Sequence, residues 1–328
     1  MIPNGGLARQ VIQHSQDQSG PRGPMVSAMK ELTRSMQIGL VGLGKMGAGM
    51  ALRLARAGHD VVGTDVSELS RTRAAENGAR TVDSLAGLVE TLEPPRVVWL
   101  MLPAGQVTRD TVGELAGLLS SGDLVIDGGN SDFRDAGANQ AKLADGGVGF
   151  ADVGVSGGQW GWQNGYGLMA GATAEDFARI EPVLDALSAD GGYQRVGDVG
   201  SGHLVKAIHN GVQYAILEAY AEGYALLAAH PEVDTLAGVS AWQQGSSIRS
   251  WLLEQILAAL QDNPTLDGVG TAVSDSGMGR WTAEEAVRLG VPTPVLTTAL
   301  YNRFASRDDG IGNKLLVAAR GRIGGQKA

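Results

Sequence analysis

Residues 36–65 read MQIGLVGLGKMGAGMALRLARAGHDVVGTD, and this stretch decides the fold of the first half of the chain. Ile38, Leu40 and Val41 fit a short buried strand, and a helical pattern follows over 45–57. The segment DVVGTD then fits a second strand. A strand, a helix and a strand in this order predict a parallel βαβ unit of a doubly wound α/β sheet.

A glycine motif, GxGxxG, lies at the turn between the first strand and the helix. Gly42 and Gly44 would let the backbone approach a pyrophosphate, and Gly47 would let the helix pack on the strand. Glycine-rich turns are common, so the motif alone is weak evidence. Its position between a strand and a helix makes it a strong indication of a dinucleotide site, because a helix N-terminus attracts phosphate.

Asp65 ends the second strand, about 20 residues beyond the glycine motif. A carboxylate at this point hydrogen-bonds the adenosine ribose and repels a 2′-phosphate, which favours NAD over NADP. Arg71 and Arg73 lie close by and keep NADP as an alternative. The structural alternative for Asp65 is an ordinary turn or helix-capping residue.

Two further buried strands are predicted in RVVWLMLPAG (96–105) and DLVIDGGNSDFRD (123–135). Their carboxyl ends should face the crevice where open parallel sheets bind ligands. Ser156, Gly157 and Gly158 follow another strand-like run, where N–H groups and a hydroxyl could hold a carboxylate, although a plain turn is the alternative. The predicted cofactor contacts are Gly42, Leu43, Gly44, Lys45, Met46, Gly47, Asp65, Leu102, Pro103, Ala104 and Asn130.

The composition is that of a globular protein with room for two domains: 328 residues, 43% hydrophobic and 19% charged. A net charge of −9 argues against binding to nucleic acid or to acidic membranes. The chain has no cysteine, and its His residues show no metal-ligand spacing. No apolar run reaches the roughly 18 residues of a membrane span. We expect a cytoplasmic protein without a metal.

Three regions are predicted. Residues 1–35 lack periodicity and are expected to form a disordered leader. Residues 36–199 form the Rossmann-type domain, and residues 200–328 form a helical domain for substrate binding and oligomerisation. Helices are expected from Ser201 to about Ala229 and over 247–260, 284–290 and 297–307.

The first of these helices contains GHLVKAIHNGVQY, residues 202–214. Its apolar residues, Leu204, Val205, Ile208 and Val212, and its polar residues, Lys206, His209, Asn210 and Gln213, each recur at helical spacing and form two faces. The ordinary interpretation of the polar face is a solvated helix side, with Lys206 reaching to solvent.

Four motifs in one order, GLGKMG, DGGNS, VSGG and GHLVKAIHNG, resemble the 6-phosphogluconate dehydrogenases of the β-hydroxyacid dehydrogenase superfamily. The resemblance runs from Met36 nearly to the end, and the chain length is similar to that of the short, often NAD-preferring type. DSGMGRWT (275–282) and ALYNRFASR (299–307) also resemble motifs of that type.

The resemblance implies oxidative decarboxylation of a sugar acid without a metal. Lys206 would be the base for the hydroxyl and then the acid at the ketone, while His209 and Asn210 would orient the substrate. Ser156, Gly157 and Gly158 would bind its carboxylate, and Asn130 would touch substrate or nicotinamide. Tyr214 and Arg303 match positions that contact a substrate phosphate. The resemblance also implies a homo-oligomer, a dimer or a tetramer.

Three positions depart from the family pattern. Gln213 replaces the glutamate that protonates the enediol, and an amide cannot deliver a proton at neutral pH. Gln326 stands where the short type has a histidine, and Met278 replaces an acidic residue. Three interpretations remain: a 6-phosphogluconate dehydrogenase in which Glu218, Tyr214 or water returns the proton, a dehydrogenase for another hydroxy acid, or a catalytically silent NAD-binding protein.

Overall fold

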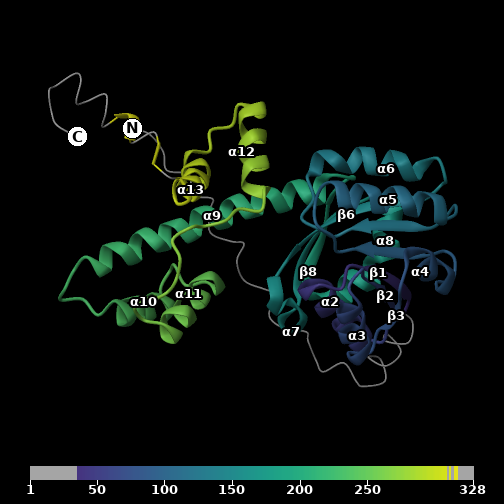
Figure 1. Cartoon of the computed structure of the whole chain (residues 1–328), viewed down its shortest axis with the longest axis horizontal. Helices are drawn as coiled ribbons and strands as arrows, with labels where there is room; N and C mark the ends of the chain where they lie inside the picture. Colours follow the sequence, from purple (N-terminus) through teal and green to yellow (C-terminus); the bar gives the residue numbers. More distant parts are fainter. Residues whose placement is uncertain (1–34, 309, 312–313, 317–328) are drawn as a thin grey trace, which may run out of the picture.

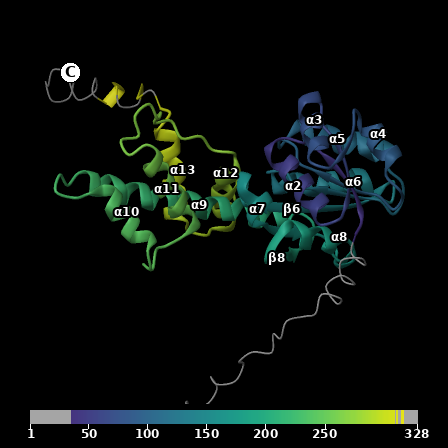
Figure 2. The same ribbon diagram turned by 90° about the horizontal axis from the view of Figure 1, so that it is seen from below.

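The computed structural model describes residues 35–308, 310–311 and 314–316. Residues 1–34 of the expected leader, and the tail with Gln326, lie outside the described residues. A sheet lobe and a helical lobe are joined by the long helix α9 (Ser201–Ala228) in Figure 1, and Figure 2 shows the same division from below.

The described part of the first lobe is built on an eight-stranded sheet with the order β3-β2-β1-β4-β5-β6-β7-β8. Strands β1 to β6 are parallel, β7 runs antiparallel to β6, and β8 is parallel to β7. The strands are β1 Gln37–Val41, β2 Asp60–Thr64, β3 Arg80–Val82, β4 Val97–Leu100, β5 Leu124–Asp127, β6 Gly149–Ser156, β7 Tyr166–Gly171 and β8 Ser188–Gly197. The order 3-2-1-4-5-6 is that of a Rossmann fold, so the predicted fold class is confirmed.

Helices cover both faces of the sheet. One face carries α4 (Leu85–Thr91), α5 (Gln106–Leu118) and α6 (Ala136–Ala144), which follows the short η1 (Phe133–Asp135). The other face carries α2 (Lys45–Arg56), α3 (Glu68–Glu76) and α8 (Ala174–Leu187), with η2 (Gly158–Trp160) and α7 (Gly161–Asn164) beside α2.

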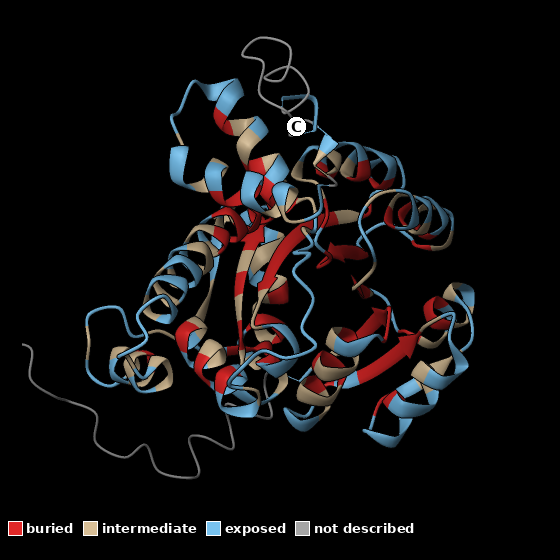
Figure 3. Ribbon diagram, turned by 60° about the vertical axis from the view of Figure 1, so that its left-hand side comes forward, coloured by how far each residue is buried: buried red, intermediate tan, exposed pale blue. Residues whose placement is uncertain are grey.

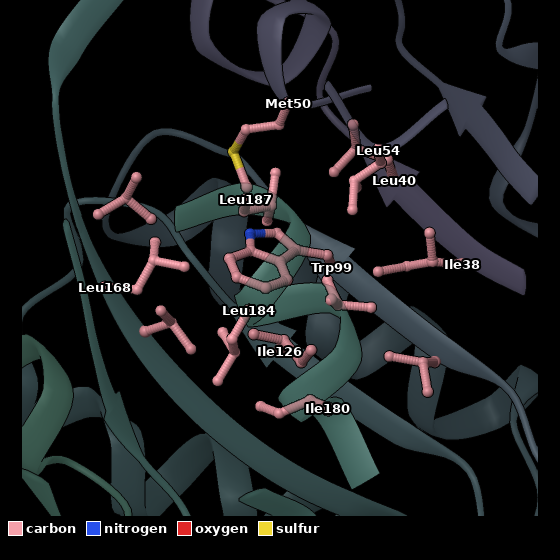
Figure 4. Packing of buried hydrophobic residues seen from close by; sticks show 14 of the residues in the cluster. Ile38, Leu40, Met50, Leu54, Trp99, Ile126, Leu168, Ile180, Leu184 and Leu187 are labelled. Atoms are coloured by element: carbon pink, nitrogen blue, oxygen red, sulfur yellow. The ribbon is translucent and has the colours of Figure 1, made fainter. Parts of the chain in front are cut away.

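The strands between the helix layers are the most deeply buried part of the lobe, as the red ribbons of Figure 3 show. Figure 4 shows Trp99 of β4 at the centre of one core, packed among Met50 and Leu54 of α2 and Leu184 of α8. Buried parallel strands read as continuous apolar runs, which is why the sequence predicted them well.

The helical lobe lies along α9. Helices α12 (Met278–Leu289) and α13 (Pro294–Ala305) pack near its middle, and α10 (Thr235–Gln243) and α11 (Trp251–Asp262) pack near its end. Three predicted helix starts were wrong, those of the helices expected over 247–260, 284–290 and 297–307. The helix expected over 247–260 begins at Trp251 because the Ser250 hydroxyl caps it, accepting from Leu253 N.

The helix expected over 284–290 begins at Met278, and α10 was not predicted. Gly277, with φ of 90°, stands as N-cap before α12, and the Asp234 carboxylate caps α10 by accepting from Ala237 N. These starts depend on single capping residues, which period-based reasoning does not detect. The helix expected over 297–307 likewise begins earlier, at Pro294, a residue suited to the first turn.

Candidate functional site

A cavity of about 1080 Å³ opens at the carboxyl ends of the parallel strands. It lies where β1 is flanked by β2 and β4, so that successive connections leave on opposite faces of the sheet. The predicted cofactor residues that line it are Gly42, Gly44, Lys45, Met46, Gly47, Asp65, Leu102, Pro103, Ala104 and Asn130. Leu43 does not line it: its side chain is buried in the core, where it would touch a Cβ at Gly63.

The glycine turn has the shape that a phosphate requires. A Cβ on Gly47 would lie 1.9 Å from the Gly42 carbonyl oxygen, so only glycine allows α2 to start this close to β1. Gly44, the N-cap of α2, has open space on its Cβ side and no side chain capping the helix. The uncapped helix N-terminus therefore faces the cavity and can accept an anion.

Asp65 lies at the same crevice and is held firmly. Its carboxylate accepts from Leu43 N at 2.7 Å and from Ser67 N at 2.8 Å, while Arg71 donates to the Asp65 carbonyl at 2.6 Å. A carboxylate has about four acceptor positions, so ribose hydroxyls can still donate to it. Asp83, Ser84 and Leu85 also line the cavity, and they were not predicted from the sequence although they follow strand β3.

The two faces of α9 are reversed relative to an ordinary amphipathic helix. The polar residues Lys206 and Asn210 are buried, whereas Ile208, Val212 and Ile216 are 42%, 44% and 39% exposed. The interpretation of the polar face as a solvated side is therefore wrong for Lys206 and Asn210. The physical reason is that this face packs against β6, β7 and α12.

Lys206 is only 5% exposed. A Cβ on Gly154 of β6 would lie 2.4 Å from Lys206 Cβ, so the lysine stem rests directly on the strand. The next residue, Val155, lines the cavity. Burial lowers the pKa of Lys206 to about 8, because the low-polarity surroundings disfavour the ammonium form.

Ser156, His209 and Asn210 form a connected set beside this amine. His209 Nδ1 lies 3.3 Å from Asn210 Oδ1, and its Nε2 lies 3.3 Å from Ser156 Oγ. An amide oxygen only accepts, so Nδ1 donates and Nε2 accepts the Ser156 hydroxyl proton. Burial, and then the charge of Lys206, lower the pKa of His209, which favours the neutral imidazole. Gly157 and Gly158 follow Ser156 at the end of β6.

Tyr214 and Arg303 are brought together from α9 and α13. The Arg303 guanidinium lies 3.7 Å from the Tyr214 ring centroid and donates to Ser274 O at 2.7 Å. Tyr214 Oη accepts from Ser276 N at 3.4 Å. Ser276 itself lines the dinucleotide cavity, so the helical lobe contributes to it. Ser276 was not predicted from the sequence, although it lies within the quoted DSGMGRWT motif.

The described residues that depart from the family pattern differ in how far they are buried. Gln213 is half-buried on α9, and Met278 is fully buried at the first turn of α12. Glu218, one of the groups considered for the final proton transfer, accepts from Asn302 Nδ2 at 2.7 Å and so is held on the α13 side. Tyr214, another of these groups, is 8% exposed beneath Arg303.

Within the described ranges, no cluster of three or more His, Asp or Glu side chains has the arrangement of a metal site. A search of the same residues for a helix with the length and hydropathy of a membrane span finds none.

Two family models match the chain. The NAD-binding domain of 6-phosphogluconate dehydrogenase matches residues 37–200, and the C-terminal domain of 6-phosphogluconate dehydrogenase matches residues 202–314.

Named relatives agree with the models. The NAD(+)-dependent, decarboxylating 6-phosphogluconate dehydrogenase of Haloferax volcanii is 39% identical over 277 residues, covering 84% of this chain and 92% of that protein. The decarboxylating 6-phosphogluconate dehydrogenase of Bacillus licheniformis is 32% identical, covering 82% of this chain but 61% of the longer relative.

Solved structures extend the comparison. The 6-phosphogluconate dehydrogenase of Plasmodium falciparum aligns with a TM-score of 0.76 and 26% identity, covering 88% of this chain and 65% of that one. The 3-hydroxyisobutyrate dehydrogenase of Salmonella typhimurium aligns with a TM-score of 0.69 and 26% identity, covering 81% and 92%. With the dinucleotide cavity and both family models, these matches show that the chain is an oxidoreductase of the short-type 6-phosphogluconate dehydrogenase family.

Proposed function

We propose that this protein catalyses the oxidative decarboxylation of 6-phosphogluconate or a closely related sugar acid, with Lys206 as the base. The observation that carries the proposal is the position of Lys206. This lysine is 5% exposed, its pKa is lowered to about 8, and its stem packs on Gly154 of β6, next to Val155, which lines the dinucleotide cavity. A lysine in that state is neutral often enough at physiological pH to accept a proton.

In the first step, Lys206 Nζ takes the proton of the substrate hydroxyl. The nicotinamide, when bound, supplies the hydride acceptor. Ser156 with the glycines after it holds the carboxylate, and His209 and Asn210 orient the sugar hydroxyls next to the amine. The hydrogen bonds among Ser156, His209 and Asn210 fix the imidazole in one orientation before substrate arrives.

In the second step, the protonated Lys206 faces the new ketone oxygen. The β-keto acid loses CO₂, and the electron pair moves toward that oxygen, which takes a proton from Nζ. An ammonium group in a buried site stabilises the developing oxyanion more strongly than it would in water. Tyr214 and Arg303, stacked at the edge of the site, are the proposed contacts for the substrate phosphate.

The last step separates two candidate functions. The enediol must receive a proton at carbon, and Gln213 cannot deliver it. Glu218 is held by Asn302 on the side of α13. This observation favours, as second candidate, a β-hydroxyacid dehydrogenase for a different substrate whose reaction ends before this protonation. A catalytically silent protein is the least favoured, because burial of Lys206 would then destabilise the fold without a use.

We propose NAD as the cofactor. The Asp65 carboxylate, anchored by two N–H groups at the adenosine end, would repel a 2′-phosphate. Arg71 donates to the backbone carbonyl of Asp65, which occupies part of the guanidinium that would otherwise bind that phosphate. NADP remains the alternative, through the remaining donors of Arg71 and through Arg73.

We also propose a homo-oligomer, at least a dimer. Ile208, Val212 and Ile216 recur every fourth residue and form an exposed apolar stripe on α9. Such a stripe on a helix next to the active site is suited to a second copy of the chain, because isologous contacts bury the same surface twice.

The test is a screen of NADH formation over phosphorylated and unphosphorylated sugar acids, with CO₂ release followed in parallel. NADH and CO₂ formed in equal amounts from 6-phosphogluconate support the first candidate. NADH without CO₂ from another hydroxy acid supports the second. NAD binding without turnover on any acid overturns both.

A further inference from the structure

A buried polar cluster lies beneath the first turn of α9, outside the proposed catalytic set. It contains Asp152 of β6, Asp127 of β5 and His203 of α9, which are 0%, 1% and 1% exposed. Buried ionisable groups are uncommon unless they have a specific role. The hydrogen bonds of these three side chains go to Gly129, Gly200, the His203 backbone and the Asp127 carbonyl, and not to Lys206, Ser156 or Asn210.

Asp152 holds the start of α9. Its two carboxylate oxygens accept from Gly200 N at 2.5 Å and from His203 N at 2.7 Å. Gly200 is the N-cap and has no side chain with which to cap the helix. A residue from the sheet therefore replaces the missing cap, and it fixes the helix N-terminus to β6.

His203 connects the same turn to a different strand. Its Nε2 lies 3.1 Å from the carbonyl oxygen of Asp127, the last residue of β5. Because a carbonyl only accepts, Nε2 carries the proton and donates. The Gly128–Gly129–Asn130 turn follows Asp127 directly and lines the dinucleotide cavity.

The other ring nitrogen has no such use. Nδ1 has no hydrogen-bond partner within the part of the chain that the structure describes, and it lies 3.9 Å from Asp152 Oδ2. A leucine would fill the same buried space without an unpaired ring nitrogen, but it could not donate to the Asp127 carbonyl. Among the described residues, the hydrogen bond to β5 is therefore the one that the imidazole ring makes.

The hydrogen bond from His203 to Asp127 connects the helix that carries Lys206 to the strand that leads to Asn130. His203 lies one turn before Lys206 on the same face of α9, and Asp127 lies three residues before Asn130. Asp65 marks the adenosine end of the cavity, so the Gly128–Asn130 turn is at the nicotinamide end. We infer that His203, held by Asp152, is a positioning residue that sets Lys206 against the nicotinamide. The inference rests on the proposed role of Lys206.

The experiment compares His203→Leu with His203→Gln and His203→Asn. The glutamine amide can reach the Asp127 carbonyl as Nε2 does, whereas the asparagine amide is too short. His59→Leu is the matched control, because His59 is also buried but lies next to the start of β2, at the opposite end of the strand from the cavity. For each variant, kcat, the NAD dissociation constant, the melting temperature and the deuterium isotope effect on hydride transfer are measured.

We expect His203→Leu and His203→Asn to lower kcat by about 10²-fold, the cost of a 1 Å misplacement, with NAD affinity largely kept. The isotope effect should rise, because hydride transfer becomes slower than the other steps. His203→Gln should restore most of kcat, and His59→Leu should lower the melting temperature without changing kcat. Equal kcat in the glutamine and asparagine variants, or a fall in stability alone, overturns the inference. The glutamine and asparagine pair decides the question if His203→Leu does not fold.

A second readout separates this inference from the proposed function. NAD should protect Lys206 from reductive methylation in the wild type and His203→Gln, but less in His203→Asn. If the wild type oxidises no sugar acid, the proposed function fails, and this protection still decides the positioning role. Equal protection in all variants would contradict it.

Discussion

Replacing Lys206 by methionine is the most direct test of the proposed chemistry. Methionine is similar in length to the lysine stem and carries no amine, so it fits the buried site on β6 without opening a cavity. At pH 7, an amine with a pKa of about 8 is neutral in roughly one molecule in ten. An ordinary lysine, with a pKa near 10.4, is neutral in roughly one in 2,500.

Burial therefore raises the neutral fraction of Lys206 by roughly 250-fold at pH 7, compared with an ordinary lysine. For the wild type, kcat/KM should rise with pH and level off above about 8, because the base must be deprotonated in the free enzyme. Lys206→Met should lower kcat by about 10²–10⁴-fold and abolish the rise of kcat/KM with pH. The affinity for NAD should stay nearly unchanged. NADH formation over a pH series, with NAD titrated separately, provides the measurement.

The same substitution should stabilise the fold at neutral pH. The pKa of Lys206 is lower in the folded than in the unfolded chain, so between pH 8 and 10.4 the unfolded chain binds more protons and wild-type stability rises with pH. Below pH 8 the burial costs about 3 kcal/mol, which the methionine variant should regain in its free energy of unfolding. A variant that retains the rise of kcat/KM with pH, or is no more stable at pH 7, would refute the assignment of a buried base.

Three further outcomes are expected. Gln213→Glu should raise turnover of 6-phosphogluconate by at least tenfold, because it adds a proton donor on the same face of α9; no rise in a steady-state assay would favour a different substrate. Asp65→Ala should weaken NAD by about tenfold to a hundredfold and narrow the gap to NADP, since it removes the charged acceptor; an unchanged ratio of dissociation constants would move cofactor selection to Arg71 or Arg73. Val212→Asp should convert the proposed oligomer to monomers in light scattering, because it places a charge in the exposed stripe; a monomeric wild type would contradict the proposed oligomer itself.

The sequence by itself determined the dinucleotide-binding half of this protein. The glycine turn, Asp65 and the buried strands are local features, because each depends on the conformation or polarity of a few consecutive residues. Gly47 illustrates this, since a Cβ there would collide with the Gly42 carbonyl five residues earlier in the chain. Helix starts were less accurate, because a single capping residue such as Ser250 decides them.

The tertiary structure decided which face of α9 is buried. Helical spacing shows that Lys206 and Ile208 lie on different faces, but burial depends on what packs against each face. Here β6, β7 and α12 cover the polar face, and the apolar stripe is left exposed. The lowered pKa of Lys206, the cap from Asp152 and the bond from His203 to β5 all follow from that packing. The hydrogen bonds of Asp152 and His203 join residues that are 48 and 76 positions apart in the chain, and no local sequence pattern encodes such contacts.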